Sequence, residues 1–249
     1  MGSAVGPSAL DCGSGQSDDG RWTTRAGRTV SRFLQGLARG RCQLTVHSTE
    51  LTDLVDNHQY VAALEAIQRL VATGTAVDEI RDTRYSGDAP LWVRMLDEGQ
   101  SDVAEFAIQV GADPNGRFIN RPAVLLAAKA GFHALVAALA EHGADVNARN
   151  DDGRSALHEA AQYGHIRVVD VLLGSGAEVD SVDRWGHTPL MIAAVFGGAA
   201  VLRRLVMAGA DPKVKDRLGN NALTYATKNN NQDGIDYLSA LDAGKSGPE

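Results

Sequence analysis

A module that returns at a fixed interval of about 33 residues, the length of one supersecondary unit, constrains this chain more than any other feature of its sequence. Gly143, Gly176 and Gly209 are evenly spaced, and each is followed by an alanine and an acidic residue. Short patterns rich in alanine that end in a second glycine return with them, as in His158–Gly164 and Met191–Gly197. A fixed period of this length predicts a stacked array in which each unit buries its apolar face against its neighbours. Such arrays present long concave surfaces, which usually bind other macromolecules.

Comparison of the chain with itself divides it into units. The step from Gly111 to Gly143 is shorter than the steps that follow it, so one unit has lost a residue from its loop. We then place Arg94 and Met95 where other units have paired alanines, and the turn Asp97–Gly99 is one residue longer than its counterparts. The expected units are residues 50–83, 84–116, 117–149, 150–182, 183–215 and 216–241, between an N-terminal arm of residues 1–49 and a tail of residues 242–249.

Local signals predict two short helices in each unit, and residues 183–215 show them best. Thr188 suits a helix N-cap, and Pro189 suits the first helical turn, where a missing N–H costs nothing. Gly197 can end this helix in the left-handed conformation, which carries no Cβ penalty for glycine. A second helix is expected around Val201–Val206, with apolar residues on one face, and Gly209 ends it.

These residues together resemble the ankyrin repeat. The pattern Asp-x-x-Gly-x-Thr-Pro-Leu-(His)-x-Ala-Ala-x-x-Gly, followed by Leu-Leu-x-x-Gly-Ala-Asp-Val-Asn, is best kept in residues 150–182 and 183–215. The resemblance is firm over residues 84–241 and loose over 50–83. It implies an all-α solenoid of about five to six helix–turn–helix units. Asn230 replaces the helix-ending glycine of the last unit, and asparagine tolerates a positive φ better than most residues.

Charge is distributed unevenly along the chain. The whole chain holds 24 basic and 31 acidic residues. Residues 1–49 contain six arginines against three aspartates, which leaves 18 basic and 28 acidic residues for the remainder. An acidic array is a poor electrostatic partner for nucleic acid or anionic lipid, so we expect neither to bind it.

The N-terminal arm differs in kind from the array. Residues 1–20 are rich in glycine, serine and aspartate, which is typical of a disordered, flexible segment. Residues 21–40 place Val30, Phe33, Leu34 and Leu37 at helical spacing among arginines. This segment either touches a membrane surface or a partner as an amphipathic helix, or it rests on the first unit, or it is upstream sequence included through a mistaken start. No secretory signal and no membrane span are expected.

The candidate motifs for catalysis or metal binding lack the spacing or the context that such sites require. No histidine has a zinc-ligand spacing, and His158 occupies the His position of the repeat pattern, where the side chain is structural. Gly244–Ser246 matches the last residues of a phosphate-binding loop. It lies in a polar tail after an expected helix, however, whereas such a loop joins a strand to a helix. We therefore expect no enzyme, no metal site and no cofactor. Two cysteines outside the array favour a reducing compartment, and we expect a cytoplasmic monomer.

The resemblance also indicates where a partner would bind. In ankyrin repeats the turn tips and the first helices face the concave groove. The matching positions here are rich in arginine and aromatic residues, which dominate interface energetics. The predicted partner-binding residues are Phe118, Arg154, Tyr163, Arg184, Trp185, His187, Phe196, Arg217, Leu218 and Lys228. The predicted function is a non-catalytic module that docks a partner protein to inhibit, tether or protect it. The alternatives are a membrane-associated regulator acting through residues 21–40 and, less favoured, a small enzyme.

Overall fold

Paired helices make up almost all of the regular structure. The structure, a computed structural model, describes residues 51, 55, 58–81 and 89–243. The predicted arm, with its segment 21–40, and residues 244–249 of the predicted tail lie outside the described residues. Among the described residues the only strands are β1 and β2, which form one two-stranded hairpin. This confirms the predicted all-α class.

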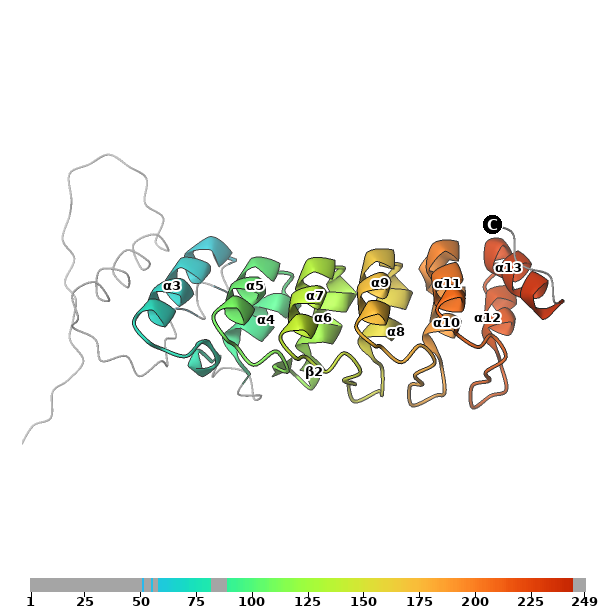
Figure 1. Ribbon diagram of the computed structural model, residues 1–249, viewed down its shortest axis with the longest axis horizontal. Coiled ribbons are helices and arrows are strands. Elements are labelled where there is room, and N and C mark those ends of the chain that lie inside the picture. Colours follow the sequence, from blue (N-terminus) through green and yellow to red (C-terminus); the bar gives the residue numbers. More distant parts are fainter. Residues whose placement is uncertain (1–50, 52–54, 56–57, 82–88, 244–249) are drawn as a thin grey trace, which may run out of the picture. The chain divides into compact units, whose positions relative to one another are not determined.

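One helix pair follows another along the chain (Figure 1). The first helices of successive pairs pack on each other in order, and so do the second helices. The elements are α3 (Tyr60–Ala72), the 3₁₀ turn η1 (Val77–Glu79), α4 (Leu91–Asp97), α5 (Ser101–Gln109), β1 (Arg117–Phe118), β2 (Arg121–Pro122), α6 (Ala123–Ala130), α7 (His133–Glu141), α8 (Ala156–Tyr163), α9 (Ile166–Gly174), α10 (Pro189–Ile192), the π-helical turn η2 (Ala193–Gly197), α11 (Gly198–Met207), α12 (Ala222–Lys228) and α13 (Gln232–Asp242).

The pair α8 and α9 shows why the sequence folds this way. Ala160 and Ala161 are fully buried on α8, and their small side chains let the neighbouring first helices approach closely. Gly164 ends α8 in the left-handed conformation, with φ 73° and ψ 22°. On α9 the apolar residues Val168, Val169 and Leu172 are buried, and their burial supplies the hydrophobic stabilisation of the unit.

The next unit departs from this plan at its first helix. Thr188 caps α10 as predicted, because its side chain accepts the N–H of Met191, and Pro189 takes the first helical position. The predicted helix end at Gly197 is wrong. The chain forms the π-helical turn η2 over Ala193–Gly197, and the glycine with positive φ is Gly198, at φ 70° and ψ 165°. A π-turn adds one residue to a helix and often marks a functional site.

Residues 84–116 also correct the alignment of the repeat. Gly99 has φ 85° and Gly131 has φ 81°, so the two glycines end equivalent helices, and the step between them is the short one. Counting from this match, the positions of the paired alanines are held by Met95 and Leu96, not by Arg94 and Met95. The turn after α4 is therefore no longer than its counterparts. The missing residue falls in the hairpin of β1 and β2, where Arg117 pairs with Pro122.

That hairpin closes through a strained two-residue turn. Ile119 and Asn120 have φ values of 48° and 58°, as a type I′ turn requires at both positions. A β-branched residue at positive φ is a conformational outlier, whereas asparagine accepts it. The last unit uses the same property, since Asn230 has φ 53°, which confirms the predicted role of asparagine at that helix end.

Replacement of Ile119 should therefore stabilise the protein. Ile119 is 60% exposed, so Ile119→Asn loses little packing and relieves strain of about 1 kcal/mol. Urea unfolding should show a higher midpoint for the variant. Val182→Asn is the control, because Val182 is also β-branched and 44% exposed but has no positive φ. An equal shift of the urea midpoint in the two variants would contradict the inference that Ile119 is strained.

Candidate functional site

The turn tips that precede α8, α10 and α12 are each organised by one side chain. Asp183 Oδ1 accepts the backbone N–H groups of Trp185 and His187, both at 2.9 Å. Asn150 and Asp216 do the same in the units before and after, each accepting the N–H groups two and four residues ahead. In a tight turn these backbone N–H groups have no backbone acceptor, so one side-chain oxygen accepts them instead.

Adjacent tips are tied to each other through the backbone. The N–H of Arg184 donates to the carbonyl of Asp152 at 2.9 Å, and the N–H of Arg217 donates to that of Trp185 at 3.1 Å. The approach needs a glycine in the tip: a Cβ on Gly186, at φ 87°, would lie 3.1 Å from the nitrogen of Arg217. The tips therefore form a continuous row that fixes the side chains standing on it.

A hollow of about 340 Å³ opens between this row and the first helices of two units. Trp185 comes from the tip and Phe196 from the π-turn, and they are 43% and 63% exposed. Exposed aromatic rings beside a cavity are unusual on a monomer surface and are typical of binding sites. The residues that line the hollow are Arg154, Gln162, Asp183, Trp185, His187, Ile192 and Phe196.

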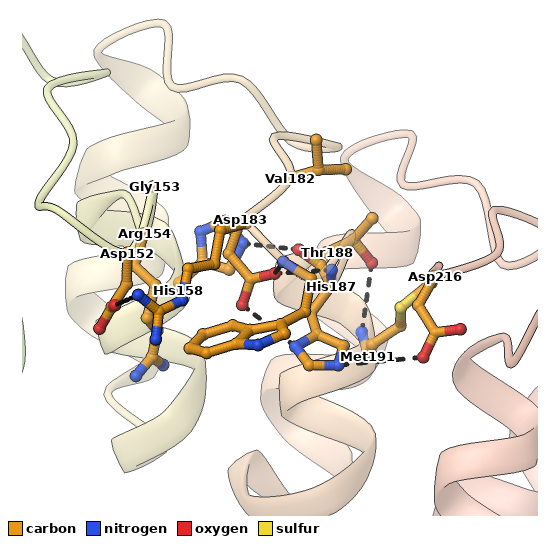
Figure 2. Close-up of polar contacts among 12 residues, drawn as sticks. Asp152, Gly153, Arg154, His158, Val182, Asp183, His187, Thr188, Met191 and Asp216 are labelled. Atoms are coloured by element: carbon orange, nitrogen blue, oxygen red, sulfur yellow. Dashed lines mark hydrogen bonds and ion pairs between the residues drawn. The ribbon is translucent and has the colours of Figure 1, made fainter. Parts of the chain in front are cut away.

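Trp185 is held in place by two neighbouring side chains. The guanidinium of Arg184 lies 4.1 Å from the centre of the Trp185 ring and also pairs with Asp152 Oδ1 at 2.8 Å. The His187 ring stacks beside Trp185 with its centre 6.0 Å away. Figure 2 shows Asp152, Asp183 and His187, which stand on these two adjacent tips. A cation over an indole and a stacked imidazole reduce the conformational freedom of Trp185 before any partner arrives.

His187 connects this unit to the next one. Its Nδ1 lies 3.1 Å from Asp183 Oδ2, and its Nε2 lies 3.0 Å from the hydroxyl of Tyr225 on α12. Tyr225 donates that hydroxyl proton to Asp216 Oδ2 at 2.5 Å. Burial and then the bond to Asp216 raise the pKa of Tyr225 to about 12.

The Asp216 carboxylate is the centre of the last tip. Burial by itself would raise the pKa of Asp216, but hydrogen bonds from Tyr225, Asn220 and Leu218 outweigh burial and lower it to about 2. Asp216 therefore stays ionised at neutral pH with its oxygens fully engaged by its own loop and by α12. Its charge strengthens the hydrogen bonds that hold this tip to α12.

His158 lies beneath the site and is structural, as predicted. Its side chain is fully buried, its Nδ1 accepts the N–H of Ser155 at 3.2 Å, and its Nε2 donates to the carbonyl of His187 at 2.9 Å. Burial lowers the pKa of His158 to about 4, although the bond to His187 opposes this. The neutral imidazole joins α8 to the next tip and offers neither nitrogen to a ligand.

The structure gathers some of the predicted site residues and separates others. Arg154, Trp185, His187 and Phe196 line the hollow, and Arg184 stacks on Trp185. Of the others, Arg217 and Leu218 are exposed on the next tip, Lys228 Nζ donates to Asn220 Oδ1 at 2.8 Å, and Tyr163 stacks on His165 away from the lining residues. Phe118 is only 7% exposed, so a partner cannot reach it, and we leave it out of the proposed site.

Sequence reasoning missed Tyr225 and the lining residues Asp183 and Ile192 as members of the site. Ile192 and Tyr225 share one repeat position, which follows the position of His158. Both therefore lie on the same face of their helices as the hollow. The repeat register could have identified them, because they hold the position one residue after that of His158 on the first helix.

Metal and membrane chemistry find no support in the part of the chain that the structure describes. No group of three or more histidine, cysteine, aspartate or glutamate side chains stands close enough to hold a metal ion there. Within the same residues, no helix has the length and apolar character needed to cross a membrane.

Comparison with known families identifies the class of the protein. A family model described as ankyrin repeats matches residues 91–183 and 175–246, which is more than half of the chain. The chain belongs to the ankyrin-repeat family, as its sequence pattern predicted. None of the curated proteins matches it. Ankyrin repeats generally mediate protein–protein interactions and are typically non-catalytic.

Proposed function

We propose that this protein docks a partner protein on the turn tips and first helices of residues 150–241, with the hollow beside Trp185 as the anchor site. The observation that carries the proposal is the pair of exposed aromatic rings, Trp185 and Phe196, at a hollow of about 340 Å³. A side chain of a partner that enters this space would contact the rings of Trp185 and Phe196. A few such anchors supply most of the binding energy of protein interfaces.

The surroundings of the hollow favour binding over chemistry. The groups with large pKa shifts, His158, Asp216 and Tyr225, have their polar atoms engaged in hydrogen bonds within a unit or to the adjacent one. A catalytic site would bring such groups to the cavity wall with free polar atoms. The proposed mechanism is therefore stoichiometric, and the bound partner is inhibited, tethered or protected by being covered.

Truncation of the two anchor rings tests this function. Trp185→Ala and Phe196→Ala should each weaken partner capture from extracts of the source cells by about 2 kcal/mol or more. Met207→Ala is the matched control, because Met207 is 79% exposed on α11 and does not line the hollow. Capture is measured by pull-down and thermal unfolding by circular dichroism, since the anchors are exposed and their loss should leave the fold intact.

The two readouts separate the possible results. Lost capture with an unchanged melting temperature supports docking at the hollow. Capture that survives both changes would rule the hollow out as the anchor site. A large loss of stability would mean instead that the rings pack on each other as part of the fold.

A further inference from the structure

The last two turn tips carry balanced formal charge, but three of their four acids are buried or partly buried. Residues 180–187 and 211–220 contain four acids, and each accepts a backbone N–H within the tips. Asp183 and Asp216 are 5% and 6% exposed. Asp180 is partly buried and accepts the N–H of Asp211, and Asp211 in turn accepts that of Lys213 at 2.8 Å. Negative charge at these tips is used internally.

The cations of the same tips face outward. Lys213, Lys215 and Arg217 are exposed, and within the described part of the chain none of their side chains has an ion pair or a hydrogen bond. They alternate along the loop with Val214 and Asp216, which are less exposed. Lys213 and Arg217 lie in turns on either side of residues 214–216, so the three exposed cations stand close together on one loop.

Equivalent positions in an inner unit are used by the fold. Asn147 and Arg149 lie two repeat periods before Lys213 and Lys215. Asn147 accepts the N–H of Glu178 at 2.9 Å, and Arg149 pairs with the carboxylate of Glu178 at 3.0 Å. Both side chains join their unit to the next one. Lys213 and Lys215 make no such junction among the described residues, so their charge remains available to a partner.

The tip two units before this basic group, residues 150–154, has the opposite sign. Asp151 and Asp152 are the counterparts of Arg184 and Trp185, and Asp152 already pairs with Arg184. The row of tips therefore changes from acidic to basic on passing the hollow. A uniform polyanion, such as a nucleic acid or an anionic bilayer, would meet both signs and a chain of net charge −7. A short protein segment can match the change of sign locally.

We propose that the docked partner is a protein segment in which a cluster of acidic residues adjoins an apolar anchor. The anchor enters the hollow beside Trp185, and the acidic cluster lies across Lys213, Lys215 and Arg217. This inference rests on the proposed function and adds the chemistry of the partner. The exposed cations steer association and select the partner, because long-range attraction between opposite charges accelerates encounter and disfavours basic competitors.

A random dodecapeptide library displayed on phage tests the proposal without a known partner. The full chain is used as bait, and the enriched peptides are synthesised and titrated. Lys215→Glu/Arg217→Glu reverses two free cations of the basic tip. Arg69→Glu/Arg167→Glu changes the net charge equally at exposed positions on α3 and α9, and is the control.

We expect enriched peptides with an acidic cluster next to an aromatic or aliphatic residue. Their affinity should fall about tenfold or more in the tip variant and less than about twofold in the control, and added salt should weaken binding to the wild type. Enrichment of neutral or basic peptides that still require Trp185 would overturn the acidic partner and leave the docking function standing. A library that yields no peptide dependent on Trp185 would count against the docking function itself.

Two further probes address the other anionic surfaces. Vesicles of phosphatidylcholine with phosphatidylserine, and a short DNA duplex, are mixed with the same three proteins. Neither should bind the wild-type chain. Binding to either probe that disappears in Lys215→Glu/Arg217→Glu would assign the basic tip to lipid or nucleic acid and overturn the protein partner.

Discussion

The free energy of unfolding is expected to fall by on the order of 3 kcal/mol between pH 7 and pH 4 because of His158 alone. Burial lowers the pKa of His158 from 6.5 to about 4 in the folded protein, while the unfolded chain keeps the higher value. Between these two values only the unfolded state binds the proton. The contribution of His158 to stability is therefore fully present above pH 6.5 and is lost as the pH falls towards 4.

The physical cause is a fixed set of hydrogen bonds. Ser155 donates its N–H to Nδ1 of His158, so a proton added to that nitrogen would face another donor. The ring cannot turn away, because its Nε2–H is held by the carbonyl of His187 and its side chain is fully buried. Protonation in the folded state thus breaks the bond that Nδ1 accepts from Ser155 and places a charge on a fully buried ring.

Urea unfolding at several pH values between 7 and 4 measures this effect. His158→Met is a suitable comparison, because Met191 holds the equivalent position in the next unit. The variant loses three hydrogen bonds and should be less stable at pH 7, but its stability should decline less towards pH 4. Parallel pH profiles for the two proteins would show that another group causes the acid sensitivity.

The architecture could be predicted from the sequence because the residues that begin and end its helices act locally. Glycines that end helices and a Thr-Pro pair that begins one act over a few residues, so Gly164 and Thr188 take their predicted roles without reference to the rest of the chain. The fixed period then supplies the order of stacking. Local signals repeated at a constant interval determine this kind of fold almost completely.

The failures have equally local reasons. Gly197 and Gly198 are adjacent, and either can take a positive φ, so the sequence does not show that the helix gains a π-turn before it ends. A loop that is one residue short can be aligned on either side of its gap, which displaced the register to Arg94. Phe118 was placed on a tip, but in the two-residue hairpin its side chain turns inward and is buried.

The candidate site was predictable only in outline. Trp185 and Phe196 belong to one unit, and repeat geometry brings a turn tip and the end of a first helix to the same hollow. The hydrogen bonds from His187 through Tyr225 to Asp216 depend on how two units pack, which no single-unit pattern contains. Tyr163 stands at the expected position, but its ring stacks on His165 instead of joining the aromatic pair.

Loss of Asp216 should have the second large effect, by destabilising the last unit. In Asp216→Ala the N–H groups of Leu218 and Asn220 and the hydroxyl of Tyr225 lose their acceptor in a buried place. Unsatisfied buried donors cost about 1–3 kcal/mol each, and partial access of water reduces the sum, so we expect a loss of about 3 kcal/mol. The pKa of Asp216, lowered to about 2, means that this stabilisation is present above pH 3.8 and is lost as the pH falls towards 2.

Hydrogen exchange locates the damage. In a repeat array each unit is stabilised by its neighbours, so the last unit can open without the rest. Amides of α12 and α13 should therefore lose protection in Asp216→Ala while those of α8 and α9 keep theirs. Asp211→Ala is the control, because Asp211 is exposed and its side chain accepts only the N–H of Lys213. Equal loss of protection in every helix would mean that Asp216 stabilises the array as a whole, and unchanged protection in α12 would show that Asp216 does not hold that helix to its tip.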